Sequence, residues 1–145
     1  MKKFWDYALI FIPILLAGLV SMMVDFGIYK DLNLPSLAPP AVLFPIMWSI
    51  LYILMGISLY LNRDNKYNMM VFWIQLAINY LWVFMFFGFE MFLGSFIVII
   101  LLAILILYTI LEFYKHNKAS AYMLIPYLLW TMFASYLNWQ IFVLN

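Results

Sequence analysis

Long apolar runs, separated by short polar stretches, occupy almost the whole chain. A helix that crosses the hydrocarbon core of a bilayer, which is about 30 Å thick, needs roughly 20 apolar residues. Runs of that length occur five times, approximately at residues 4–24, 41–61, 68–87, 91–113 and 119–143. The pattern predicts an all-α integral membrane protein with a bundle of five transmembrane helices, which form one domain over residues 1–145.

Composition removes several classes of protein. With 70% hydrophobic and 9% charged residues, the chain is far more apolar than a soluble domain. Its net charge of +1 argues against nucleic acid as a partner, and the absence of cysteine excludes disulfides and thiolate metal sites. The first apolar run is longer than that of a secretory signal, so we expect a retained helix that contacts membrane lipid.

Basic residues are distributed unequally between the two ends of the predicted helices. Five spans place Lys30 on one side of the membrane and the other six on the opposite side: Lys2, Lys3, Arg63, Lys66, Lys115 and Lys118. Loops rich in Lys and Arg remain in the cytoplasm. We therefore expect a protein of a bacterial cell membrane with a cytoplasmic N-terminus, and with the loop after the first span and the C-terminus outside.

The middle of every predicted span lacks Asp, Glu, Lys, Arg and His. Ion-driven transporters need an ionisable group near the midplane, because its change of charge drives transport. The sequence therefore favours a passive or ligand-binding role. The single histidine, His116, lies in a basic loop without a second metal ligand, so no metal site is expected.

Polar and aromatic residues within the spans recur at helical spacing, and each set therefore lies on one helical face. With a rise of about 1.5 Å per residue, the three sets converge in the outer half of the membrane. Aromatic rings with a few hydrogen-bonding groups are what a planar apolar ligand requires. The three sets are Trp48 and Tyr52; Gln75, Asn79, Trp82 and Phe86; and Trp130, Ala134 and Asn138.

The same polar residues have a purely structural interpretation. Amides and hydroxyls often pair between membrane helices, at about 0.6–2 kcal/mol per contact, and tryptophans collect at membrane interfaces. Under this interpretation the protein is structural or docks a partner, and its polar faces only hold helices together. The sequence leaves both interpretations open.

The loop over residues 29–45 is rich in proline and apolar side chains. Proline fixes φ and lowers the entropy lost when a loop is ordered, and exposed apolar side chains favour folding back onto the protein. We expect this loop to form a preorganised lid over the converging aromatic residues. The residues expected to form the lid are Pro35, Leu37, Pro39 and Pro40.

Three segments match motifs of one protein family. LPSLAPPAVLFPIMWSILYILMGI (residues 34–57) is similar to KPxWxPPxxxFxxVWxxLYxxMG, NYLWVFMFFG (79–88) to NxxWxPxFFG, and IPYLLWTMFASYLNW (125–139) to PYLxWxxFAxxLN. Over nearly its whole length the chain resembles the TspO/MBR family, which comprises the tryptophan-rich sensory proteins and the mitochondrial translocator protein.

The resemblance implies a five-helix bundle, commonly a homodimer, that serves as a receptor or carrier. It binds porphyrins such as protoporphyrin IX, other tetrapyrroles of the haem pathway and benzodiazepine-type ligands under the first loop. Porphyrin is then a ligand, and no cofactor is required. The pocket residues implied by motif position are Tyr29, Trp48, Asn79, Trp82, Trp130 and Ala134.

The resemblance also implies an enzymatic alternative, the light- or oxygen-dependent degradation of porphyrin. Trp48 and Trp130 would then relay electrons, since the sequence supplies no groups for general acid–base chemistry. If the three sets of polar and aromatic residues within the spans were only structural, substitution of Asn79 or Trp130 would change stability and leave ligand affinity unaltered.

Several positions depart from the family motifs. Leu34 replaces the lysine before the first proline of the loop, and Leu37 replaces its tryptophan, so an aromatic cover for a ligand is lost. Phe84 replaces the proline of the third span, for which a straighter helix is expected. No basic residue follows Tyr136, so sterol binding is not expected.

Overall fold

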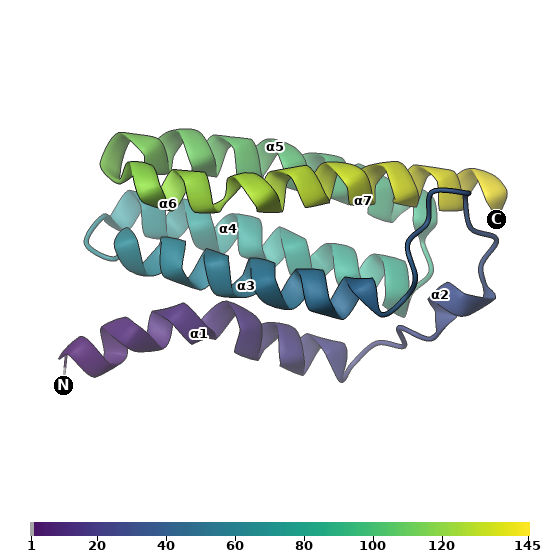
Figure 1. Cartoon of the computed structure of the whole chain (residues 1–145), viewed down its shortest axis with the longest axis horizontal. Coiled ribbons are helices and arrows are strands. Elements are labelled where there is room, and N and C mark those ends of the chain that lie inside the picture. Colours follow the sequence, from purple (N-terminus) through teal and green to yellow (C-terminus); the bar gives the residue numbers. More distant parts are fainter. Residues whose placement is uncertain (1) are drawn as a thin grey trace.

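Long helices lie side by side in the computed structural model, which describes residues 2–145 (Figure 1). The chain ends lie at opposite ends of the bundle, and a short helix, α2, lies near the C-terminus (Figure 1). The helices are α1 (Lys2–Ser21), α2 (Ile28–Asp31), α3 (Leu43–Leu61), α4 (Lys66–Val83), α5 (Phe92–His116), α6 (Lys118–Met123) and α7 (Ile125–Leu144).

The first four predicted spans correspond to single helical segments. Each is long and apolar enough to cross a membrane: Lys3–Ser21, Leu43–Leu61, Lys66–Gly88 and Phe92–His116. The span predicted at about residues 119–143 is divided in the structure, because Leu124 separates α6 from α7. Pro126 lies in the first turn of α7, where its missing N–H is tolerated but would interrupt a continuing helix.

A π-helical turn, Phe84–Gly88, ends the third span. Its backbone closes with a hydrogen bond from the Phe89 N–H to the Phe84 carbonyl at 2.9 Å. Loss of the family's proline at Phe84 therefore does not give the regular helix that a straighter span would require. The wider turn carries an extra residue, and the successive side chains of Phe86 and Phe87 both border the smaller cavity described below.

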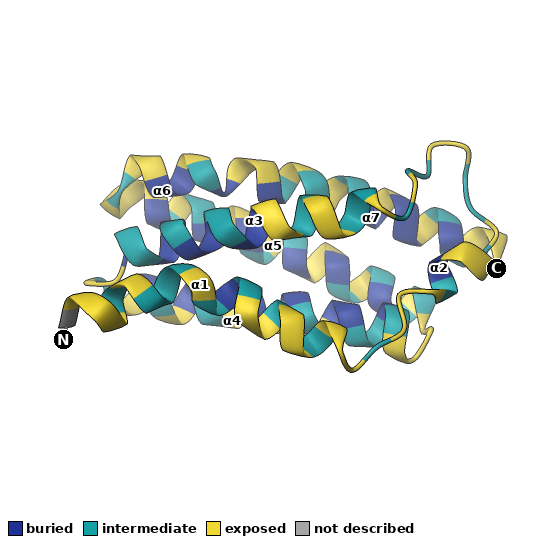
Figure 2. Ribbon diagram, turned by 60° about the horizontal axis from the view of Figure 1, so that its bottom comes forward, coloured by how far each residue is buried: buried dark blue, intermediate teal, exposed yellow. Residues whose placement is uncertain are grey.

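Buried residues lie on the helix faces turned toward the interior of the bundle, and exposed residues lie mainly on its outside (Figure 2). The helix α5 contacts α4, α6 and α7, whereas α1 packs mainly on α3. The centre holds large apolar side chains that are at most 1% exposed, namely Leu51, Met55, Leu59, Phe72, Leu76, Ile99, Leu102, Ile106 and Phe113.

Ion pairs and amides gather at the end of the bundle that holds the N-terminus, which we call the basic end. Arg63 Nε lies 3.6 Å from Asp6 Oδ2, and His116 Nε2 lies 2.9 Å from Asp64 Oδ1. The hydrogen bond from His116 lowers the pKa of the Asp64 carboxyl. These contacts confirm that the N-terminus and the loops near residues 63 and 116 share one end.

A buried polar cluster closes the basic end between α3, α4 and α6. The Asn62 amide donates to the Ser120 hydroxyl at 2.8 Å, and the Asn68 amide donates to Asn62 Oδ1 at 2.8 Å. The Ser58 hydroxyl donates to the Ser120 carbonyl at 2.9 Å. All four side chains are at most 2% exposed.

Glycine allows a close approach of α1 and α3. A Cβ added at Gly56 would lie 1.7 Å from the carbonyl oxygen of Ile10, so no other residue fits without separating the helices. The Arg63–Asp6 pair and a hydrogen bond from the Tyr80 hydroxyl to the Pro13 carbonyl, at 2.7 Å, also hold α1. The distance between α1 and α3 therefore depends on the close contact at Gly56.

We expect Gly56→Ala to lower stability by about 1–3 kcal/mol, because the added methyl group overpacks a backbone contact. The matched control is Gly18→Ala, since a Cβ at that helical position has nothing within 4 Å. The control should be neutral or slightly stabilising. Thermal unfolding of both variants in the same detergent measures the difference, and equal unfolding temperatures would contradict the close contact.

Candidate functional site

A cavity of about 610 Å³ lies at the opposite end of the bundle from the basic end, between α1, α2, α3 and α4. Most of its large lining side chains are aromatic. They are Phe26, Tyr29, Phe44, Trp48, Tyr52, Tyr80, Trp82 and Phe87. The volume lies within the range of about 300–1,000 Å³ typical of small-molecule sites.

Three aromatic side chains reach this cavity from one face of α3. Phe44, Trp48 and Tyr52 are spaced four residues apart and therefore lie one above the other. The Trp48 ring stacks on Tyr52 at a centroid distance of 5.6 Å and an angle of 29°. It also lies 6.1 Å from the ring of Trp82 on α4. The result is a continuous aromatic wall shared by two helices.

The wall contributed by α1 consists of smaller side chains, among them Ala17, Gly18 and Ser21. Gly18 and Ser21 are also exposed on the outside, as are Pro45 and Ser49 of α3, which line the same cavity. The cavity therefore reaches the surface between α1 and α3. In a membrane this surface faces lipid.

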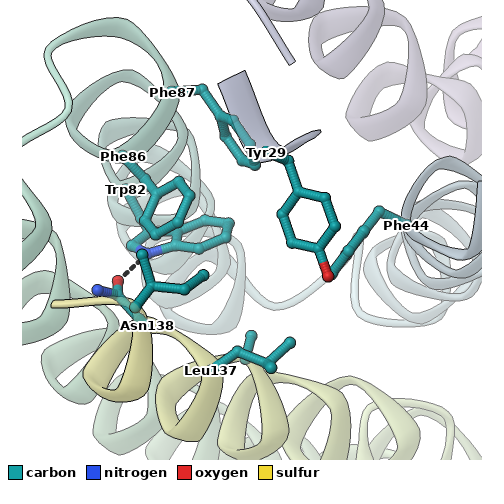
Figure 3. Close-up of a pocket in the computed structure, with 9 residues that line it drawn as sticks. Tyr29, Phe44, Trp82, Phe86, Phe87, Leu137 and Asn138 are labelled. Atoms are coloured by element: carbon teal, nitrogen blue, oxygen red, sulfur yellow. Dashed lines mark hydrogen bonds between the residues drawn. The ribbon is translucent and has the colours of Figure 1, made fainter. Parts of the chain in front are cut away.

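A second, smaller cavity of about 20 Å³, whose lining is drawn in Figure 3, shares residues with the first. Tyr29, Phe44, Trp82 and Phe87 line both. The small cavity has room for about one water molecule. The remaining lining residues come from the π-helical turn and α7, and they are Phe86, Ala134, Leu137, Asn138 and Ile141.

Four polar side chains form a buried network beside the cavity. The Tyr52 hydroxyl donates to Asn79 Oδ1 at 2.5 Å, and the Asn79 amide donates to the Tyr127 hydroxyl at 2.9 Å. The Tyr127 hydroxyl in turn donates to Gln75 Oε1 at 2.7 Å. The network connects α3, α4 and α7 at a depth where no lipid group can replace these partners.

A second network is centred on Asn138 of α7. Its Oδ1 accepts hydrogen bonds from the Trp82 indole at 2.9 Å, drawn in Figure 3, and from the Ser95 hydroxyl at 3.0 Å. Its amide donates to the Phe92 carbonyl at 2.8 Å. One asparagine thus satisfies groups on α4 and α5, and it is 1% exposed.

The structure brings most of the predicted site residues to the cavities. Tyr29, Trp48, Tyr52 and Trp82 line the large cavity, and Phe86, Ala134 and Asn138 line the small one. The other three predicted residues, Gln75, Asn79 and Trp130, line neither.

Their positions show what each does in this structure. Asn79 hydrogen-bonds within the bundle through both polar atoms of its amide, as the packing interpretation expects, and Gln75 does so through Oε1. The Gln75 Nε2 atom is buried without a partner among residues 2–145. Trp130 is half-buried, with its ring 5.9 Å from that of Phe44. Its indole Nε1 is buried and has no hydrogen-bond partner among residues 2–145.

The proline-rich loop is fastened at two points. Tyr29 of α2 is buried, and its hydroxyl donates to the Pro39 carbonyl at 2.7 Å. Burial raises the pKa of the Tyr29 hydroxyl, so this donor stays protonated. Asn33 and Asn145 exchange hydrogen bonds at 3.1 and 3.0 Å, which hold the loop against the end of α7.

The middle of the loop does not border either cavity. Pro35, Leu37, Pro39 and Pro40 are absent from both linings, and Leu37 is 66% exposed. Tyr29, Lys30, Ala41 and Val42 line the large cavity instead. A covering role of the loop stays a prediction, and in this structure only its two ends reach the site.

Sequence reasoning missed the contribution of α1. Its small residues gave no chemical signal, and the pair Gly18 and Ser21 is as consistent with a contact between helices as with a cavity wall. Phe44 was also missed, although its spacing of four from Trp48 was a usable signal. The residues described hold no group of His, Asp and Glu that could bind a metal ion.

Comparison with known proteins identifies the family of the chain. The sequence profile of the TspO/MBR family matches residues 8–144. The chain belongs to the TspO/MBR family. It is a membrane protein with five helical spans, of which α6 and α7 together form the fifth.

Relatives in this family include archaeal and bacterial proteins. The chain is 40% identical to the tryptophan-rich protein TspO of Archaeoglobus fulgidus over 81% of its length and 79% of the relative. It is 40% identical to the protein of the same name in Chlorobaculum tepidum, over 81% and 78%. Protein CrtK of Rhodobacter capsulatus is 34% identical over 96% and 92%.

We expect Asn138→Leu to destabilise this TspO/MBR protein by about 1–2 kcal/mol, because it leaves the Trp82 indole buried without its acceptor, whereas the Ser95 hydroxyl keeps the Phe92 carbonyl at 3.1 Å. Gln140→Leu is the control on the same helix, since no hydrogen bond of its side chain occurs among residues 2–145. Thermal unfolding in detergent measures both. A loss of equal size in the control would show that the network contributes nothing specific.

Proposed function

We propose that this protein is a membrane receptor for planar hydrophobic ligands, and that porphyrins such as protoporphyrin IX are the preferred ones. The observation that carries the proposal is the cavity of about 610 Å³ with an aromatic wall on α3 and α4. Aromatic faces attract flat π-systems and add about 0.5–1.5 kcal/mol per ring pair beyond the area buried. Benzodiazepine-type ligands fit the same description.

The shape of the cavity supports a flat ligand. One side carries the rings of Trp48, Tyr52 and Trp82, and the α1 side carries Ala17 and Gly18. Small residues opposite large rings leave space in which a planar molecule can lie against the rings. The opening between α1 and α3 would admit such a ligand from the lipid without passage through water.

Packing at the basic end supports a receptor rather than a carrier with an open path. Below the cavity, Leu51, Met55 and Leu59 of α3 are at most 1% exposed. The satisfied cluster of Asn62, Asn68, Ser58 and Ser120 closes the end of the bundle. A ligand that crossed the membrane would have to separate these helices.

Porphyrin degradation is the alternative in the enzymatic class. Of the two tryptophans implicated, Trp48 lines the large cavity and Trp130 does not. A relay would therefore begin at Trp48, whose ring centroid lies 6.1 Å from that of Trp82. The lining contains no carboxylate or histidine among the residues described, so binding is the function that the cavity favours.

The distribution of basic residues bears on the orientation of the protein in the membrane, and the family bears on its oligomeric state. With the positive-inside rule we propose that the basic end faces the cytoplasm, so that the cavity opens in the outer half of the membrane. The family resemblance supports a homodimer. Neither the orientation nor the homodimer alters which residues line the cavity.

Titration of purified protein with protoporphyrin IX, followed by quenching of tryptophan fluorescence, tests the proposal. We expect saturable quenching, and an affinity about three- to tenfold weaker in Trp48→Phe, since part of a ring contact is lost. Trp139→Phe is the control, because Trp139 is 41% exposed and lines neither cavity. Quenching that does not saturate would overturn the proposal.

A variant that fills the cavity tests the same site without removing an aromatic group. Ala17→Phe places a ring in the space opposite Trp48, and we expect it to weaken porphyrin binding at least tenfold with little loss of stability. Leu16→Phe, one residue away and outside the lining, should bind as the original protein does. Equal affinity in both variants would place the ligand elsewhere.

A further inference from the structure

One cation borders the large cavity. Lys30 is the only basic residue among those that line it, and it lies in α2. Its neighbour Tyr29 is 5% exposed and is bonded to Pro39, so α2 is anchored to the rim of the cavity. The anchor fixes Lys30 at the mouth, on the exposed side of the same short helix.

The ammonium group of Lys30 is available for a ligand. Among residues 2–145 no carboxylate lies within 4.0 Å of it, whereas Lys115 and Arg63 at the basic end are both paired. Three acidic residues share the end of the bundle with Lys30, but Asp25, Asp31 and Glu90 line neither cavity. Asp25 instead accepts a hydrogen bond from the Gly27 N–H at 2.8 Å.

The position of Lys30 also suits an amphiphilic ligand. The helix α2, which carries Lys30, lies beyond the start of α3 and near the C-terminus of the chain (Figure 1). Since α2 lies beyond the end of a predicted span, we expect Lys30 at the level of the membrane interface. An acid group remains partly hydrated at that level, while an attached apolar body enters the lipid-facing cavity. Burial of a bare carboxylate deeper among Trp48 and Tyr52 would be strongly unfavourable, because it would lose its hydration without gaining a partner, and a position at the interface avoids this loss.

We propose that the cavity selects planar hydrophobic molecules that carry a carboxylate, and that Lys30 is the specificity-determining residue that binds this group. The ring system of the ligand lies against Trp48 and Trp82, and its carboxylate points outward to the ammonium of Lys30. This inference rests on the proposed function and adds a chemical class to it. A dicarboxylic porphyrin satisfies both requirements, whereas its diester satisfies only the first.

The test compares protoporphyrin IX with its dimethyl ester in the same neutral detergent, by tryptophan quenching. We expect the diacid to bind roughly two- to fivefold more tightly, as for a partly exposed ion pair. Lys30→Met should remove this preference by weakening the diacid alone, and Lys30→Arg should keep it. High salt should reduce the preference in the original protein.

Lys66→Met is the matched control, since Lys66 is an exposed lysine at the basic end. It should leave both affinities unchanged. Equal binding of diacid and diester, with saturation and sensitivity to Trp48→Phe intact, would overturn the role of Lys30 and leave the proposed function standing. That result is also expected if Lys30 binds only lipid phosphate. If neither porphyrin binds saturably, both proposals fail.

Discussion

Within a lipid bilayer no water is present to satisfy a buried amide or hydroxyl, and this constraint organises the centre of the bundle. Asn79 and Asn138 are at most 1% exposed, and each hydrogen-bonds to two other helices. Together they connect α3, α4, α5 and α7. Each of these contacts fixes the rotation of a helix, because an amide that turned away would lose its partners in an apolar medium.

The helix α1 takes no part in these two networks. The close contact at Gly56, the Tyr80–Pro13 hydrogen bond and the Arg63–Asp6 pair attach it to the rest. The large cavity lies where α1 departs from this well-connected set of helices. An aromatic wall on one side and a helix with small side chains and few buried residues on the other suit a site that must admit a bulky ligand from lipid.

Two residues connect the polar networks to the cavity. Tyr52 and Trp82 hold their polar atoms in hydrogen bonds to Asn79 and Asn138, and both line the large cavity. The networks therefore set the orientation of the aromatic rings. The packing and ligand-binding interpretations of the three sets of residues are compatible, because the polar side chains that pack the helices also orient the aromatic side chains that line the cavity.

The apolar spacing of the sequence determined the class of fold, the number of spans and which chain segments share an end, because lipid accepts only helices with satisfied backbones. Helical spacing also brought Gln75, Asn79, Trp82 and Phe86 to one buried face. Spacing alone does not show which neighbour a side chain meets. Tertiary structure decided that Asn79 and Gln75 bond within the bundle while Trp48 borders open space.

The hydrophobic pattern of the sequence also does not predict the local geometry of the backbone. The break at Leu124 and the π-helical turn at Phe84–Gly88 depend on how single turns satisfy their hydrogen bonds, not on hydrophobic period. The cavity wall on α1 depends on where Ala17 and Gly18 stand relative to the rings of α3. Sequence thus determined which faces are apolar or polar. The volume left between them arises only when helices with large and small side chains are placed against one another.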